Sequence, residues 1–213
     1  MQKAQVAANW KADIKPFQST LARLIAENPN VAPDIDDPMF ALCERTASAA
    51  ARLLRDYPND GVLYYGIIYP HAYWEGVVAR WQGDNAKART AFAMARSEVE
   101  KILEKQPDFP AALSLLGMID AGLGRKEEAI REGRRACELL PMSKDAVDGV
   151  AFAVNLAQIY AWTGEKDLAI EQLAAPLKVP NDCHYGELRL HPMWDVLRGD
   201  PRFEKLVASQ APK

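Results

Sequence analysis

Apolar residues recur at helical spacing along most of the chain, and residues 111–141 show this pattern most clearly. A first segment carries apolar side chains three residues apart, which would form one stripe on a helix. Two glycines then interrupt the pattern, and a proline ends a second amphipathic segment. In chain order these markers are Leu113, Leu116, Ile119, Gly122, Gly124 and Pro141. Because glycine permits a sharp turn and proline cannot continue a helix, the segment predicts two antiparallel helices.

Small residues on both predicted helices indicate that the two helices cross closely. Gly117 lies inside the first helix, where glycine costs about 1 kcal/mol relative to alanine. Close approach of a neighbouring helix explains why a glycine would occupy that position. On the second helix, Ala129, Gly133 and Ala136 are separated by four and three residues and therefore share one face.

The same markers recur at a constant spacing, which indicates an internal repeat. There are three sets of markers, and within each set the residues are separated by 41 and then 40 positions. The sets are the turn glycines Gly83, Gly124 and Gly164, the alanines Ala88, Ala129 and Ala169, and the small residues Gly76, Gly117 and Ala157. The spacing predicts three helical hairpins, at residues 71–106, 110–141 and 150–179.

The flanking segments predict further helices. On the N-terminal side we expect a short helix within residues 2–13, a better one at 16–28 and another at 39–55, with Asp37 as a candidate N-cap. Residues 63–68 have strand-like composition, but we expect a helix or an extended linker because no other segment offers a strand partner. Near the other end, residues 191–198 predict a short helix. Asp200 and Pro201 then mark the start of a last helix.

Composition narrows the class of protein. The chain has 213 residues, of which 49% are hydrophobic and 26% charged, and its formal net charge is −3. This balance is typical of a folded protein and provides no basic field for nucleic acid. No apolar run reaches about 18 residues, so we expect no membrane insertion of this chain. Three widely spaced cysteines, Cys43, Cys137 and Cys183, indicate reduced thiols and a cytoplasmic location.

The hairpin pattern resembles the tetratricopeptide repeat (TPR), which combines small residues at the helix crossing, a turn glycine and a terminal proline. The resemblance implies an all-α fold: a right-handed TPR-like solenoid of helical hairpins with a C-terminal capping helix. We expect one continuous solenoid domain, with N-terminal helices at 1–62, three repeats at 63–180 and a cap at 181–213. A cap is expected because a solenoid exposes its last apolar face unless another segment covers it.

Three longer blocks resemble the C-terminal repeat region of certain bacterial signalling proteins. The blocks are GRKEEAIREGRRACELLP, LAQIYAWTGEKDLAIEQL and HPMWDVLRGDPRFEKLVAS. In those proteins a serine/threonine kinase, a cyclase or a winged-helix regulator precedes such a region. The resemblance implies a repeat module within a longer chain, although a free-standing protein fits nearly as well. A membrane-spanning parent chain would place the module in the periplasm instead.

Few residues offer catalytic or metal-binding chemistry. Cys183, His184 and His191 could bind a metal ion, but their spacing matches no known pairing and favours a polar linker. Asp145 and Asp148 could act as an acid–base pair, although helix capping is the better interpretation. Cys137 lies among small residues and indicates packing. We therefore expect no catalytic residue, no metal site and no cofactor, and a protein that is not an enzyme.

A cluster of basic residues on the second hairpin alternates with acidic ones. The cluster comprises Arg125, Lys126, Arg131, Arg134 and Arg135, and the interleaved acids are Glu127, Glu128 and Glu132. This alternation is typical of a solvated helix face crossed by ion pairs. Contact with a phosphate or an acidic peptide is the alternative.

The resemblance places the first helix of each repeat along a concave groove. The residues it assigns to that surface are Tyr73, Val77, Arg80, Trp81, Ser114, Met118, Ala121, Val154, Gln158 and Trp162. Aromatic side chains with one arginine suit the binding of an amphipathic peptide. We therefore expect a non-catalytic scaffold or sensor module of a bacterial signalling system that binds a protein or peptide, with Trp81 and Trp162 partly exposed.

Two other interpretations of the groove stay open. In the first, its aromatic residues pack against the N-terminal helices or the tail of the same chain. In the second, the groove closes around a small ligand, for which Arg80 and Gln158 are the candidate polar groups.

Overall fold

A computed structural model describes residues 8, 11–27, 38–179 and 183–212. The protein is 72% helix and 3% strand, which confirms the predicted all-α class. The chain divides into two compact units: one spans Pro58–Asn181, and the other combines Met1–Tyr57 with Asp182–Lys213. The grouping of the N-terminal and C-terminal segments in one unit is a feature that the sequence does not predict.

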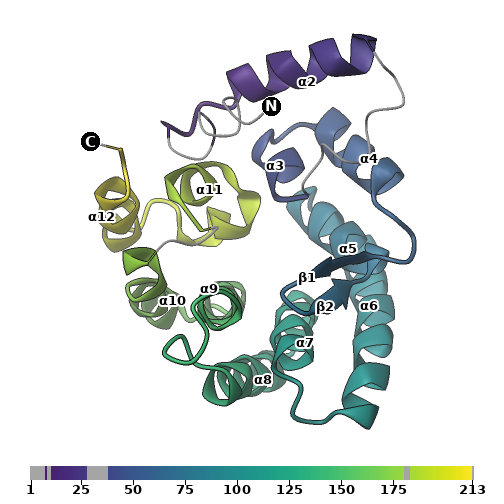
Figure 1. The fold of residues 1–213 in the computed structure, drawn as a ribbon, viewed down its shortest axis with the longest axis vertical. Coiled ribbons are helices and arrows are strands. Elements are labelled where there is room, and N and C mark those ends of the chain that lie inside the picture. The colour runs from purple at the N-terminus through teal and green to yellow at the C-terminus, as the bar shows by residue number, and fades with distance from the viewer. Residues whose placement is uncertain (1–7, 9–10, 28–37, 180–182, 213) are drawn as a thin grey trace. The chain divides into compact units, whose positions relative to one another are not determined.

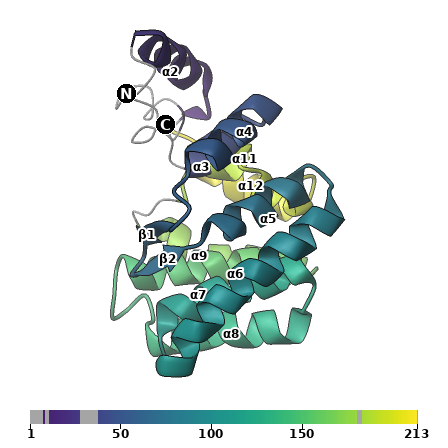
Figure 2. The same cartoon turned by 90° about the vertical axis from the view of Figure 1, so that its right-hand side faces the viewer.

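The unit Pro58–Asn181 contains three consecutive helical hairpins (Figure 1). The hairpins are α5 (His71–Trp81) with α6 (Asn85–Lys105), α7 (Pro110–Leu123) with α8 (Lys126–Leu139), and α9 (Asp148–Trp162) with α10 (Lys166–Leu173). Each helix packs against the next in chain order, and α7 also packs against the other two first helices, α5 and α9. Figure 2 shows α6, α7 and α8 from the side. A short 3-10 helix, Pro176–Lys178, follows α10.

The repeated glycines form the turns and the close helix crossing that the sequence predicts. Gly83, Gly124 and Gly164 have φ values of +79°, +78° and +87°, a left-handed conformation that glycine adopts without strain. Gly117 brings α7 close to α8, because a Cβ atom there would lie 3.0 Å from the carbonyl oxygen of Ala129. The three hairpins therefore turn in the same way at the positions that the spacing marks.

Residues 62–69 form a β-hairpin, so the prediction of a helix or linker at 63–68 is wrong. Strands β1 (Val62–Tyr64) and β2 (Ile67–Tyr69) pair antiparallel, with Leu63 opposite Ile68. The loop between them is Tyr65–Gly66, whose φ values of +47° and +80° match the two-residue turns that suit hairpins. The segment supplies its own strand partner, which the search for a distant partner overlooked.

The second unit is built from short helices at both ends of its sequence range. They are α2 (Lys15–Glu27), α3 (Pro38–Cys43), α4 (Ala47–Asp56), α11 (Tyr185–Leu190) and α12 (Pro201–Ser209), with a 3-10 helix at Pro192–Leu197. The predicted helix at 16–28 corresponds to α2, on which Phe17 and Leu21 are buried. The predicted capping by Asp200 is confirmed, since its side chain accepts a hydrogen bond from the backbone N–H of Arg202. The predicted helix within residues 2–13 and the Asp37 N-cap lie largely or wholly outside the described residues.

The prediction of one helix at 39–55 is wrong, because two helices, α3 and α4, occupy this range with a break between them. Arg45 has φ +54°, a left-handed conformation that ends the helical path after α3. Thr46 then begins α4, because its hydroxyl accepts a hydrogen bond from the N–H of Ala49 at 3.1 Å. A threonine N-cap needs no glycine or proline nearby, so the usual sequence markers of a break are missing.

The Arg45 side chain joins the two segments of this unit. Its guanidinium donates two hydrogen bonds to the carboxylate of Asp195, at 2.9 and 2.7 Å. Asp195 also accepts a hydrogen bond from Arg198 at 2.8 Å, and Arg198 donates to the carbonyl oxygens of Leu188 and His191. Arg198 thus connects three points of the C-terminal segment, at residues 188, 191 and 195.

Candidate functional site

The residues assigned to the groove divide into a buried group and a partly exposed group. Tyr73, Val77, Ser114, Met118, Ala121 and Gln158 are buried, whereas Arg80, Trp81, Val154 and Trp162 are half-buried. The buried group cannot contact a partner directly. Any recognition at this face therefore depends on the half-buried residues, which come from α5 and α9.

Contacts among the first helices bring several of these residues together. The Tyr73 hydroxyl on α5 donates to the sulfur of Met118 on α7 at 3.7 Å. Ser114 on α7 accepts a hydrogen bond from the Asn155 amide on α9 at 3.0 Å. These contacts hold α5, α7 and α9 side by side and fix the positions of the side chains nearby.

Arg80 and Trp162 form the most distinctive pair on this face. The guanidinium carbon of Arg80 lies 4.5 Å from the centre of the Trp162 ring, which is the geometry of a cation–π contact. Trp162 also lies near Phe92 on α6, with ring centres 6.3 Å apart. Helices α5, α6 and α9 thus meet at one half-buried indole.

Among the described residues, no carboxylate lies within ion-pair distance of the Arg80 guanidinium and no acceptor takes its N–H groups. Burial lowers the pKa of Arg80, because removal from water disfavours a charged group that has no partner. Arginine nevertheless remains charged at neutral pH. The site therefore presents a partly dehydrated cation.

Gln158 on α9 is a second hydrogen-bond donor without a described partner, in addition to Arg80 on α5. Its side chain is 2% exposed, and its Nε2 atom has no hydrogen-bond partner in the part of the chain that the structure describes. Because Gln158 and Trp162 are four residues apart, they share one face of the helix. Buried amide groups normally have partners, so this amide marks a place where an acceptor is missing.

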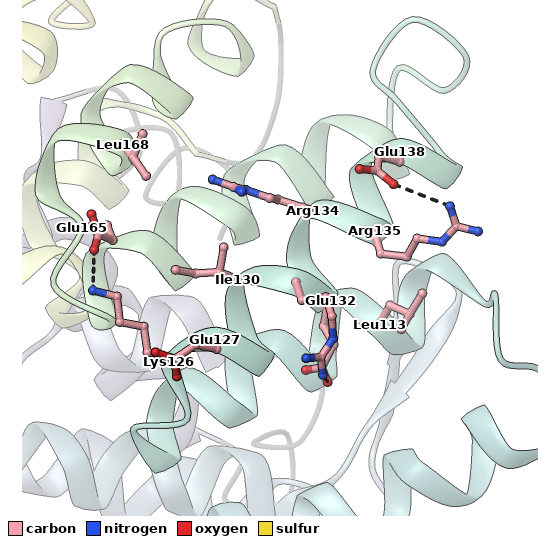
Figure 3. Close-up of a pocket in the computed structure, with 11 residues that line it drawn as sticks. Leu113, Lys126, Glu127, Ile130, Glu132, Arg134, Arg135, Glu138, Glu165 and Leu168 are labelled. Carbon is pink, nitrogen blue, oxygen red and sulfur yellow. Dashed lines mark hydrogen bonds and ion pairs between the residues drawn. The ribbon is translucent and has the colours of Figure 1, made fainter.

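A hollow of about 790 Å³ lies on a different surface of the same unit, mainly over α8 (Figure 3). Ile130 from α8 and Leu168 from α10 contribute apolar side chains to it. The complete lining is Leu113, Lys126, Glu127, Ile130, Arg131, Glu132, Arg134, Arg135, Glu138, Glu165 and Leu168. Much of the predicted basic cluster therefore surrounds this hollow.

Several charges around the hollow are paired within the protein. Lys126 pairs with Glu165, and Arg135 pairs with Asp108 at 2.9 Å and with Glu138 at 3.5 Å. These contacts agree with the interpretation of the basic cluster as a solvated face crossed by ion pairs. Such exposed pairs leave little net charge to attract a ligand.

Arg134 on that surface contacts a tyrosine. Its Nε atom donates to the Tyr160 hydroxyl at 2.8 Å, and its guanidinium lies 5.7 Å from the centre of the Tyr160 ring. Figure 3 shows the Arg134 side chain extending toward Leu168 of α10. Arg134 is exposed, so water satisfies its remaining donors. It differs in this respect from Arg80, whose surroundings exclude much of the solvent.

Two buried carboxyl groups lie between the helices of the central hairpin, and sequence reasoning missed them as a pair. Asp120 on α7 is 0% exposed and Glu132 on α8 is 8% exposed. Asp120 accepts a hydrogen bond from Arg96 of α6 at 2.8 Å, while burial and the neighbouring Asp120 raise the pKa of Glu132 to about 8. One signal was available, because Asp120 is the only charged residue within the apolar segment 110–123.

The residues considered for catalysis or metal binding have structural roles. His184 caps α11 by accepting a hydrogen bond from the N–H of Glu187, and Asp145 accepts from the N–H groups of Val147 and Asp148 ahead of α9. Burial raises the pKa of Cys137 to about 11, which keeps its thiol protonated at neutral pH. Within the described ranges, no group of three or more His, Cys, Asp or Glu side chains could hold a metal ion.

Comparison with known proteins gives no relative from which a function could be transferred. No family model, no curated protein and no solved structure matches this chain. In the described part of the chain, no helix is both long and apolar enough to cross a membrane.

Proposed function

We propose that this chain is a non-catalytic binding module, a right-handed solenoid of TPR-like hairpins that holds a segment of another protein or peptide. The binding face consists of the half-buried side chains of α5 and α9. Resemblance to the repeat regions of bacterial signalling proteins supports a role as a scaffold or sensor within such a system, in a longer chain or in a complex.

The observation that carries the proposal is the stack of Arg80 on Trp162. Arginine and tryptophan dominate the binding energy of many protein interfaces, because both combine a large contact area with directional hydrogen bonds. Trp81 lies next to Arg80 in the sequence and is also half-buried. Such a group of residues is a common feature of peptide-binding surfaces and has no evident need in a purely structural repeat.

Selection of peptides on the immobilised full chain tests the proposal. A displayed library of random short peptides should yield binders that share apolar residues at a fixed spacing. Replacement of Trp81 or Trp162 by alanine should weaken these peptides about ten-fold, which corresponds to about 1.4 kcal/mol. Met94→Ala is the matched control, since Met94 is an apolar residue of α6 that is 55% exposed.

Two results would contradict the proposal. One is a selection that enriches no peptide on a folded wild-type chain. The other is a set of peptides that bind the tryptophan variants as tightly as they bind the wild type, when the variants have unchanged circular dichroism spectra. The second result would mean that the peptides bind at another surface, and the hollow over α8 would be the next candidate.

A small-ligand sensor is the second candidate function. It is favoured by the buried Gln158 amide, whose Nε2 atom lacks a partner among the described residues. A small molecule with an oxygen acceptor could satisfy that amide and Arg80 together. A thermal-shift screen of small carboxylic acids would support this candidate if a hit stabilised the wild type and failed to stabilise Gln158→Leu.

A further inference from the structure

We propose that Arg80 binds a side-chain carboxylate of the captured peptide, so that this module selects acidic segments with apolar neighbours. This inference rests on the proposed binding function and specifies the chemistry of its ligand. It starts from the half-buried guanidinium that has neither an ion-pair partner nor a hydrogen-bond acceptor among the described residues.

The geometry of the stack leaves Arg80 ready for a carboxylate. A guanidinium carries five N–H donors, and the Arg80 guanidinium carbon lies 4.5 Å from the centre of the Trp162 ring. No described residue accepts a hydrogen bond from these donors, so they stay available for the two oxygens of a carboxylate. Because Arg80 is already partly dehydrated, binding removes less water from it than from an exposed arginine.

The surroundings of Arg80 specify the rest of the ligand. Trp162 lies beneath the guanidinium and Trp81 follows it on α5, so apolar surface is present beside the cation. An acidic residue within a peptide has neighbours on both sides that can cover this surface, whereas a chain end has a neighbour on only one side. We therefore assign the carboxylate to an Asp or Glu side chain.

The chain contains a matched control for this proposal. Arg134 is also an arginine over an aromatic ring, but it is exposed and its Nε atom donates to the Tyr160 hydroxyl. Arg134→Gln removes the same charge as Arg80→Gln from the other surface of the unit. An effect of net charge alone would appear in both variants.

The experiment uses peptides selected from a library that is displayed through the peptide C-terminus, so that every enriched acid is a side chain. The best peptide is synthesised with its acidic residue and with the corresponding amide, Asp→Asn or Glu→Gln. Fluorescence anisotropy then gives the affinity of both peptides for the wild type, Arg80→Gln, Arg80→Lys and Arg134→Gln. Thermal unfolding of each variant establishes that it is folded.

We expect the amide peptide to bind the wild type about ten-fold more weakly than the acidic peptide, and the two peptides to bind Arg80→Gln equally. Arg80→Lys should retain part of the preference, because lysine keeps the charge and loses the planar edge. Arg134→Gln should behave like the wild type.

Three results would overturn the inference and leave the proposed function intact. Enriched peptides could lack acids, the acid preference could persist in Arg80→Gln, or it could disappear only in Arg134→Gln, which would place the carboxylate in the hollow. A preference seen only for a free C-terminal carboxylate in synthetic peptides would also contradict the side-chain assignment. Failure to enrich any peptide would instead remove the proposed function, and this inference with it.

Discussion

Asp120 on α7 and Glu132 on α8 are both buried, and the charge of Asp120 adds to the effect of burial on the pKa of Glu132. Asp120 Oδ2 and Glu132 Oε2 have no hydrogen-bond partner in the described structure. Burial and a neighbouring negative charge both favour the neutral form of a carboxyl group, so Glu132 keeps its proton at neutral pH. The central hairpin is therefore built around a protonated acid at neutral pH.

The first prediction concerns alkaline pH. The folded state raises the pKa of Glu132 from 4.5 to about 8, so the folded protein keeps a proton that the unfolded chain releases. The stabilising effect of that proton is complete below pH 4.5 and is lost as the pH rises toward 8. The free energy of unfolding should fall across this range, by at most about 1.4 kcal/mol per pH unit.

Glu132→Gln should remove this pH dependence, because an amide can donate to Asp120 at every pH. Urea unfolding followed by circular dichroism at several pH values measures the effect. Glu127→Gln is the control, since Glu127 is exposed on the same helix and should leave the slope unchanged. If the free energy of unfolding changed with pH equally in wild type and Glu132→Gln, Glu132 would not be the group that keeps the proton.

The second prediction concerns acidic pH and the other unit. His191 is 0% exposed, and burial lowers its pKa from 6.5 to about 3. The imidazole stays neutral when folded, whereas the unfolded chain takes up a proton below pH 6.5. The stability that depends on His191 is thus present above pH 6.5 and is lost as the pH falls toward 3.

Hydrogen exchange should separate the two units, because their stabilities change in opposite directions with pH. Peptides from residues 183–212 should lose protection as the pH falls from 6.5, after correction for intrinsic exchange. Peptides from 110–140 should lose protection as it rises. His191→Asn keeps an acceptor for the Met193 N–H and removes the titrating group, so it should flatten the acid response. Parallel changes in both regions would contradict this assignment.

The third prediction tests the close crossing of α7 and α8. Gly117→Ala would place a Cβ atom 3.0 Å from the carbonyl oxygen of Ala129 and 3.1 Å from the backbone nitrogen of Gly133. Alanine gains about 1 kcal/mol in helix propensity, but a backbone contact relaxes poorly. We expect a net destabilisation of about 1–3 kcal/mol.

Gly83→Ala provides the comparison for Gly117→Ala, since no atom lies within 4 Å of its added Cβ. Its only penalty is the left-handed backbone, about 1–2 kcal/mol. Asparagine tolerates this conformation, so Gly83→Asn should lose less stability than Gly83→Ala. Asparagine should not rescue Gly117, because the obstacle there is space. Urea unfolding of the four variants decides the matter, and rescue at both sites would contradict the crowding argument.

The fourth prediction concerns the ion pair between Arg45 and Asp195. Because both side chains are more than a third exposed, we expect a coupling of only about 0.5–1 kcal/mol in a double-mutant cycle of Arg45→Ala and Asp195→Asn. The cycle is needed because Asp195 also binds Arg198. Arg189 and Glu204, 3.7 Å apart and more exposed, should give a smaller coupling. Equal values for the two pairs would contradict a special role for Arg45.

Sequence patterns predicted the hairpins because both determinants are local. Helical periodicity places the apolar stripe, and a turn glycine such as Gly124 needs only its own backbone freedom. The sequence did not predict the break at Arg45 or the turn at Tyr65. Both residues adopt a left-handed backbone conformation that arginine and tyrosine rarely take. The pairing of β1 with β2 requires the turn at Tyr65, and Arg45 adopts its conformation where it binds Asp195, 150 residues away.

The candidate site was predictable in its residues and not in their arrangement. The repeat alignment indicated Arg80, Trp81 and Trp162, because it specifies which positions of a first helix share a face. It could not show that Arg80 lies over Trp162, since side-chain rotamers and the positions of α5 and α9 relative to each other decide that contact. Asp120 and Glu132 were missed as a pair because charged residues on helices usually face water, and their burial depends on three helices together.

The bridge from Arg45 to Asp195 also bears on how the protein is made. The two residues are 150 positions apart, so the ribosome must continue for roughly 10–30 seconds after Arg45 before Asp195 exists. The hairpins of the intervening unit need only neighbouring sequence and can form as they emerge. The helices near Arg45 must wait with apolar side chains such as Leu42 uncovered. During that interval the nascent chain is a natural client for a chaperone.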